Sequence, residues 1–144
     1  MTESGIAAAT AGRSVTFSKT VTESDVYLFA GITGDLSPNH VDEAAMSKTR
    51  YGRRIAHGAL LVGFMSNTST AMITELGGAA VSYGYNRIRF VAPVFFGDTI
   101  TVTYSIREVD LTNSKTFSDV VVRNADGVTV AAAEHILYFL AEAK

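Results

Sequence analysis

The strongest constraint on the fold is a long apolar segment of helical period that precedes four segments of strand character. From His57 to Leu76 the apolar residues recur at steps of three and four, and Gly77 and Gly78 end the pattern. The segments of strand character are 80–91, 99–109, 115–123 and 128–140, and turn-forming residues separate them. A helix of about 20 residues is about 30 Å long, which is enough to cover one face of a sheet. This order predicts an α+β domain with an antiparallel sheet.

The first half of the chain carries helical signals after one opening strand. Residues 13–21 alternate in polarity, which indicates the strand. Thr22 precedes two acidic residues, as at the start of a helix, and this helix is expected over residues 23–32. A second short helix is expected over residues 41–48, again with acidic residues at its start.

The composition fits a single domain over residues 13–144, after a loose tail over residues 1–12. Of the 144 residues, 47% are apolar and 18% are charged, and a chain of this length buries roughly two thirds of its unfolded surface. Apolar runs such as 59–65 are far shorter than a membrane span. The N-terminal stretch has no basic flank before an apolar core. We therefore expect neither a membrane helix nor a signal peptide.

Missing residue types and motifs exclude several classes of protein. The chain has no cysteine, which excludes disulfides, thiolate nucleophiles and cysteine zinc sites and favours a cytoplasmic location. A net charge of −2 and a pI near 5.9 give no sign of nucleic-acid binding. The glycine-rich motifs of nucleotide-binding proteins and the GxSxG motif of serine hydrolases are absent as well. A nucleotide-hydrolysing or dinucleotide-dependent enzyme is therefore not expected.

The segment GDLSPNH, residues 34–40, places a carboxylate and an imidazole five positions apart. Neighbours on a helix face lie three or four apart, and Pro38 pushes the preceding residue out of helical geometry. Asp35 and His40 can therefore meet only if the loop curls, and they would then form a proton-transfer pair. Alternatively, Asp35 is a turn residue whose side chain caps the segment. The residues alone leave both interpretations open.

Two further places could contribute to a site. Gly58 follows His57 at the start of the long helix, where main-chain N–H groups are unpaired, so its N–H could bind a developing negative charge. Gly58 could equally serve close packing. A basic cluster lies between the GDLSPNH segment and this helix and is either a solvated patch or an anion site; its members are Lys48, Arg50, Arg53 and Arg54.

The remaining candidates are a metal site and the last histidine. Asp35, His40, Asp42 and His57 could in principle bind a divalent metal, but no recognised ligand spacing supports this, and no metal is predicted. His135 lies in the last strand segment among apolar residues, which is typical of a packing role.

The chain resembles the MaoC-like dehydratases, or R-specific enoyl-CoA hydratases, in four ordered features. GDLSPNHVD is similar to the family's signature, and YGRRIAHGALL is similar to the segment that enters its central helix. Ser66, nine residues after His57, matches a serine of that helix. FVAPVFFGDTITV, residues 90–102, is similar to the family's strand–turn–strand. The features span residues 27–102.

The resemblance implies a hot-dog fold, in which an antiparallel sheet wraps one long helix, and at least a homodimer. It implies reversible addition of water to a trans-2-enoyl-CoA to give the (R)-3-hydroxyacyl-CoA, with no cofactor, because CoA is part of the substrate. The alternatives are a hot-dog acyl-CoA thioesterase and a non-catalytic acyl-CoA binding module. Fold alone does not separate these functions.

The resemblance also implies roles for individual residues. Asp35 and His40 would act on one water, Gly58 N–H would hold the thioester oxygen, and Ser66 would orient Asp35 or the substrate. His57 and the basic cluster are expected to contact the substrate, the latter at the nucleotide end of CoA. Ser37 replaces the family's asparagine, and Asn39 replaces a common aliphatic residue. We expect the Asn39 amide to bond the loop backbone; contact with a polar group of the substrate is the alternative.

Overall fold

The structure, a computed structural model, describes residues 3–141. Its five strands form one antiparallel sheet in the order β1-β3-β4-β5-β2. Each strand begins and ends within one residue of its predicted bounds; the strands are β1 Ser14–Thr20, β2 Ala80–Phe90, β3 Thr99–Asp110, β4 Lys115–Asn124 and β5 Thr129–Phe139. The prediction of an α+β domain with an antiparallel sheet is confirmed.

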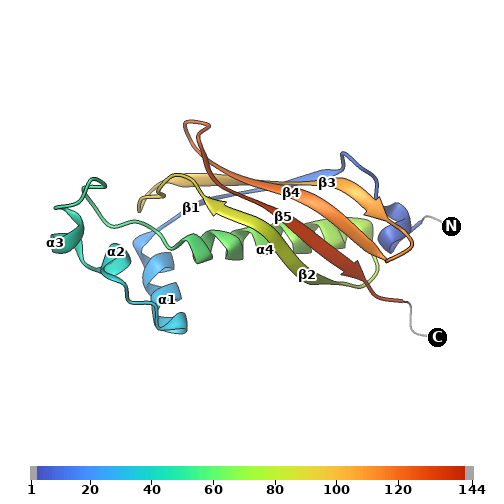
Figure 1. The fold of residues 1–144 in the computed structure, drawn as a ribbon, viewed down its shortest axis with the longest axis horizontal. Coiled ribbons are helices and arrows are strands. Elements are labelled where there is room, and N and C mark those ends of the chain that lie inside the picture. Colours follow the sequence, from blue (N-terminus) through green and yellow to red (C-terminus); the bar gives the residue numbers. More distant parts are fainter. Residues whose placement is uncertain (1–2, 142–144) are drawn as a thin grey trace.

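The long helix α4, Gly58–Leu76, lies along one face of this sheet (Figure 1). Its fully buried Met65 and Met72 belong to one hydrophobic core cluster with alternate residues of β3 and β4, among them Val102 and Val120. Alternate residues of a strand point to the same face, so the period-two pattern of the strands and the helical period of α4 converge on one core. This is the expected hot-dog arrangement, a sheet wrapped around one central helix.

Three shorter helices gather beyond the end of the sheet at which α4 begins (Figure 1); they are α1 Glu23–Thr33, α2 Pro38–Val41 and α3 Glu43–Met46. Thr22 caps α1 as predicted: its hydroxyl accepts from Asp25 N, while the Asp25 carboxylate accepts from Thr22 N. Gly34 ends α1 with a φ of 77°, which a residue with a side chain adopts at a cost.

The helix expected over residues 41–48 is instead the single turn α3, and a second single turn, α2, precedes it. Asp42 separates them because its backbone is extended, with φ −118° and ψ 93°, and its side chain caps α3 by accepting from Ala45 N. Pro38 occupies the first position of α2, where its fixed φ suits a helix and its missing N–H costs nothing. Four-residue helices are too short to be stable alone, so tertiary contacts must hold this region.

Residues 5–8 form a 3₁₀ turn, η1, at the far end of the sheet. Gly5 and Ala9 are buried there, and Ile6 packs against the core. This packing differs from the loose tail expected for residues 1–12, of which residues 1 and 2 lie outside the described range. Within residues 3–141, no helix combines the length and the apolar character needed to cross a membrane.

Candidate active site

The segment between α1 and α2 carries Asp35 and ends on His40. After Gly34 the chain turns, and Asp35 Oδ1 accepts a hydrogen bond from Ser37 N at 3.3 Å. The turn role considered for Asp35 is therefore present in the structure. Pro38 then starts the single turn α2, which carries His40 inward until only 8% of that residue is exposed, while Asp35 remains exposed.

This loop brings Asp35 and His40 together and adds His57. One carboxylate oxygen of Asp35 and one ring nitrogen of each histidine lie within 4.8 Å of one another. The imidazoles of His40 and His57 are stacked, with centroids 3.6 Å apart and planes inclined by 24°. Phe29 of α1 packs edge-on against His57 at 4.8 Å. Residues from α1, α2 and the start of α4 thus meet at one point.

Main-chain carbonyls fix the protonation of both rings. His40 Nδ1 lies 2.7 Å from Ile55 O, and His57 Nε2 lies 3.0 Å from Asp35 O. A carbonyl oxygen only accepts, so Nδ1 of His40 and Nε2 of His57 carry protons. In neutral His40 the lone pair is then on Nε2. Burial, and to a lesser extent the neighbouring His57, lowers the pKa of His40 below its ordinary 6.5 against the opposing effects of the Ile55 carbonyl and Asp35.

The same three side chains also have the donor types of a metal site. The lone pairs of an imidazole lie in the plane of its ring, and two nearly parallel stacked rings do not direct them at one ion. His40 Nδ1 and His57 Nε2 are moreover occupied by main-chain carbonyls. The arrangement therefore suits proton transfer to and from a water better than metal coordination.

A pocket of about 540 Å³ opens beside His40. Its wall combines the start of α4 with the end of β2 and the turn that follows; the residues are Asn39, His40, Arg50, Tyr51, Ile55, Ala56, Gly58, Leu61, Phe90, Val91, Ala92, Pro93 and Val94. Sequence reasoning missed Tyr51 and Phe90. The one sequence signal that pointed to residues 92–94 was the resemblance of FVAPVFFGDTITV, residues 90–102, to the family's strand–turn–strand.

Gly58 satisfies both interpretations given for it. It lines the pocket and begins α4, so its N–H belongs to the first helical turn, which has no partner within the helix. A Cβ at this position would lie 2.6 Å from the Phe90 ring, closer than carbon atoms pack. The absence of a side chain thus serves the packing of Phe90 and also leaves this part of the pocket wall without a side chain.

The other predicted site residues occupy different places. Arg50 lines the pocket, Arg53 stacks on Phe95 at 3.9 Å, and Lys48 is exposed. Arg54 forms ion pairs with two carboxylates, at 2.6 and 2.7 Å. Ser66 is exposed on α4, about 12 Å along the axis from Gly58, and is not in the pocket wall.

The Asn39 side chain is exposed at the pocket, while its main-chain oxygen accepts from Ile55 N at 2.9 Å. The bond between Asn39 and the neighbouring backbone is thus a main-chain bond. Among the described residues the Asn39 amide itself forms no hydrogen bond to the loop backbone, in contrast to the expectation.

Comparison with known proteins assigns the family. The family described as "MaoC like domain" matches residues 7–131. The chain belongs to the MaoC-like dehydratase family. An (R)-specific enoyl-CoA hydratase of Rhodospirillum rubrum is 42% identical over 95 residues, which are 66% of this chain and 64% of that hydratase, less than two thirds of its length. The 3-hydroxyacyl-thioester dehydratase Z of Mycobacterium tuberculosis is 35% identical over 127 residues, 85% of this chain and 84% of the relative.

Solved structures agree with the MaoC-like assignment at the level of the fold. The (R)-hydratase from A. caviae involved in PHA biosynthesis superposes with a TM-score of 0.84, over 92% of this chain and 98% of the other, at 23% identity. At that identity the likeness shows the hot-dog fold alone. The MaoC-like domain thus places the Asp35–His40 pair, the pocket and the start of α4 within a family of hydratases and dehydratases.

Proposed function

We propose that the protein is an (R)-specific enoyl-CoA hydratase, which adds water reversibly to a trans-2-enoyl-CoA. The observation that supports this most directly is the convergence of Asp35 and His40 beside a pocket whose wall includes Gly58, the first residue of α4. Relatives named as an (R)-specific enoyl-CoA hydratase and a 3-hydroxyacyl-thioester dehydratase support a reaction of this class. The chemistry needs a base for water, a proton for C2 and a donor for the thioester oxygen.

In the proposed reaction, water binds between the Asp35 carboxylate and His40 Nε2. One of the two accepts a proton as the water oxygen forms its bond to C3. The C2–C3 π electrons move toward the thioester, whose oxygen carries the enolate charge, and C2 then takes up a proton from the same pair. The lowered pKa of His40 keeps its ring neutral near pH 7, as an acceptor must be.

The enolate oxygen is assigned to Gly58 N–H. A main-chain donor held by a 19-residue helix needs no reorganisation as charge develops, and the positive end of the helix dipole favours the anion. His57 supports both members of the pair, because its ring stacks on that of His40 and its Nε2 donates to Asp35 O. The proposed role of His57 is therefore positioning.

For the nucleotide end of CoA, we assign the phosphate contact to Arg50, with Lys48 and Arg53 beside it. Arg50 is exposed and lines the pocket, and a guanidinium suits phosphate recognition. Arg50→Glu should raise KM for crotonyl-CoA at least tenfold, because a charge-assisted hydrogen bond is worth about 1.5–3 kcal/mol. Rates on crotonyl-pantetheine, which lacks the nucleotide, should change little. Equal damage to both thioesters would contradict the assignment.

The active form is proposed to be a cytoplasmic homodimer, joined at β2. This strand is an edge of the sheet, and exposed apolar side chains lie on it and just beyond it; they are Val81, Tyr83, Phe90 and Val91. An apolar edge strand with free N–H and C=O groups invites pairing with another chain. Sedimentation at micromolar concentration tests the dimer.

The test of the function is a crotonyl-CoA assay that follows loss of the absorbance of the conjugated thioester. The expected result is saturable loss of absorbance with no release of free thiol. Release of thiol would indicate a thioesterase, and saturable binding without turnover would indicate a binding module. Inactivity on crotonyl-, longer-chain and branched enoyl-CoAs would refute the proposal. Chiral analysis of the 3-hydroxyacyl product tests the (R) assignment.

A further inference from the structure

Residues 55–57, which precede α4 and are called the template below, are hydrogen-bonded to the segment 35–40 that carries Asp35 and His40. Ile55 N donates to Asn39 O at 2.9 Å, and Ile55 O accepts from His40 Nδ1 at 2.7 Å. Two residues later, His57 Nε2 donates to Asp35 O at 3.0 Å. Both members of the proposed pair are thus tied to alternate residues of one extended stretch.

The template is itself attached to the sheet. Ile55 forms an antiparallel bridge with Phe95, and Ala56 N donates to Val94 O at 2.8 Å. The template is therefore attached to the turn between β2 and β3, and it connects that turn to the segment that carries Asp35 and His40. Helices α1 and α3 lie before and after that segment in the chain, and these bonds do not reach them.

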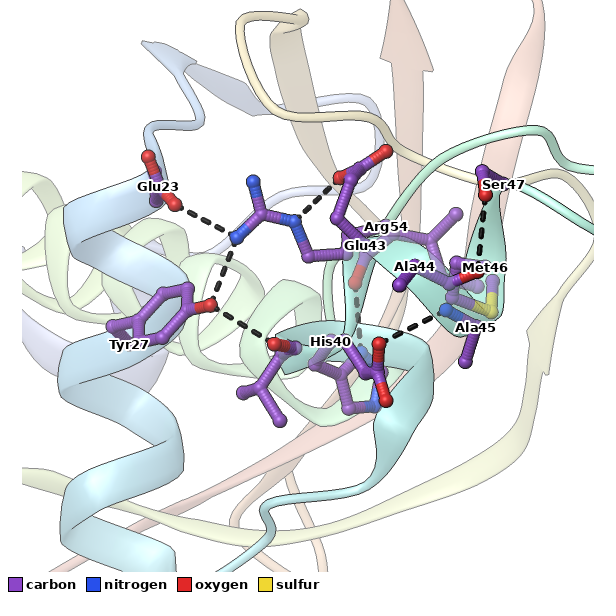
Figure 2. A network of polar contacts seen from close by, with 12 residues as sticks. Glu23, Tyr27, His40, Glu43, Ala44, Ala45, Met46, Ser47 and Arg54 are labelled. Atoms are coloured by element: carbon purple, nitrogen blue, oxygen red, sulfur yellow. Dashed lines mark hydrogen bonds and ion pairs between the residues drawn. The ribbon is translucent and has the colours of Figure 1, made fainter.

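Arg54, the residue before the template, contacts both of these helices through its side chain. Its Nε donates to Glu43 Oε2 of α3 at 2.6 Å, and its Nη1 donates to Glu23 Oε1 of α1 at 2.7 Å and to Tyr27 Oη at 2.8 Å. Figure 2 shows the guanidinium between the two carboxylates. Tyr27 Oη donates onward to Val41 O at 3.2 Å, next to His40 in sequence.

We propose that Arg54 is a positioning residue: its guanidinium joins α1 to α3 so that the segment between them holds Asp35 and His40 in reactive geometry. The inference rests on the proposed function of that pair. It also separates Arg54 from the other basic residues of its cluster, because the charge of Arg54 is already met by two carboxylates.

The contacts of Arg54 are suited to orientation more than to overall stability. The Glu23 and Glu43 side chains are 59% and 51% exposed, and ion pairs with exposed carboxylates contribute little to the free energy of unfolding. A planar guanidinium, in contrast, directs its donors along fixed lines, which the single ammonium of lysine does not. Since α2 and α3 are single turns, contacts of this kind decide where they lie.

The experiment compares Arg54→Met, Arg54→Lys and Glu43→Gln with a matched control, Arg13→Met. Arg13 also pairs with a carboxylate, Glu75, at 3.6 Å, but its guanidinium lies by η1 and the end of α4, where it donates to Ala8 O and Glu75 O. Steady-state rates with crotonyl-CoA give kcat and KM, and an NMR titration without substrate gives the pKa of His40. Circular dichroism and Tm establish that each variant is folded.

For Arg54→Met we expect kcat to fall about 10- to 100-fold, because small misplacements of catalytic groups have effects of that size, with KM within about twofold. The kcat values of Arg54→Lys and Glu43→Gln should lie between those of Arg54→Met and wild type. The ionisable side chains near His40 are Asp35 and His57, and Arg50 lies in the same pocket wall. Loosening should also hydrate His40, so its pKa should rise toward 6.5. Arg13→Met should leave both readouts unchanged.

Two outcomes would overturn the inference. A raised KM with unchanged kcat would make Arg54 a substrate contact, and an unchanged pKa of His40 in folded Arg54→Met would remove the positioning role. If wild type turns over no enoyl-CoA, the proposed function fails, yet the titration still decides the role of Arg54. As a further check, Tyr27→Phe added to Arg54→Met should lower kcat by a smaller factor than Tyr27→Phe does in wild type, because the two side chains belong to one chain of contacts.

Discussion

The buried histidine of β5 makes a quantitative prediction about stability in acid. His135 is fully buried, with Nδ1 2.8 Å from Tyr104 Oη and Nε2 2.7 Å from Ser82 Oγ. A hydroxyl can donate or accept, so both contacts suit the neutral ring. Glu134, the next residue, faces the other side of the strand, where Asn86 and Arg107 bind its carboxylate. No carboxylate of the described residues forms an ion pair with His135.

Burial therefore lowers the pKa of His135 from 6.5 to about 4. Above pH 6.5 the ring is neutral in the folded and unfolded states and adds no pH dependence. As the pH falls below 6.5, the unfolded chain binds the proton first, so stability is lost down to about pH 4 and the loss is constant below that. Integrated over this window the loss is about 3 kcal/mol, of which about 2 kcal/mol is reached at pH 5.

The assay is urea unfolding of wild type and His135→Gln at pH 7 and pH 5, at one protein concentration because oligomers gain stability with concentration. Glutamine keeps a hydrogen-bonding group but does not titrate. The variant should be less stable at pH 7, yet its loss between the two pH values should be about 2 kcal/mol smaller than that of wild type. His40, whose pKa is also lowered, contributes to both proteins and cancels. Equal losses in the two proteins would refute the reasoning.

Three further predictions concern the site. Asp35→Asn and His40→Gln should each lower turnover by about 10²–10⁴-fold, and the double variant little more than the worse single one; near wild-type rates in a folded variant would contradict this. Gly58→Ala should displace the Phe90 ring and lower stability by about 1–3 kcal/mol, measured by urea unfolding, and a smaller Phe90→Leu partner should recover part of the loss. Asn39→Leu should leave turnover of crotonyl-CoA within about threefold, because the loop bond is a main-chain bond; selective loss with mesaconyl-CoA would instead identify the amide as a specificity residue.

Periodicity predicted the elements of this fold because each element obeys a local rule. The strands alternate and α4 repeats at three and four, so their bounds follow from sequence to within one residue. The exceptions on α4 are Thr68 and Ser69, which are buried although polar. Their hydroxyls bond Met65 O and Ser66 O one turn back in the same helix, so burial leaves no unpaired donor.

The geometry of the candidate site was less accessible to sequence reasoning because its partners are distant in sequence. The stacking of His40 on His57 depends on how residues 55–57 lie against α2. No local sequence pattern predicts that arrangement. Arg54 stands in a basic cluster, where sequence alone suggests an anion site. Its partners, 11 and 31 residues away on two other helices, give it a different environment from that of Arg50.

The turn role and the catalytic role of Asp35 need not compete. A carboxylate offers about four lone-pair sites, so Oδ1 can accept from Ser37 N while the other oxygen serves the proposed water. Protonation of that second oxygen during turnover would leave the turn bond in place. This is why Asp35→Asn is the informative substitution: the amide oxygen can still hold Ser37 N, while the NH₂ group cannot accept a proton. If Asp35→Asn and Asp35→Ala unfold at different urea concentrations but are equally inactive, the turn and the chemistry reside on separate oxygens of one side chain.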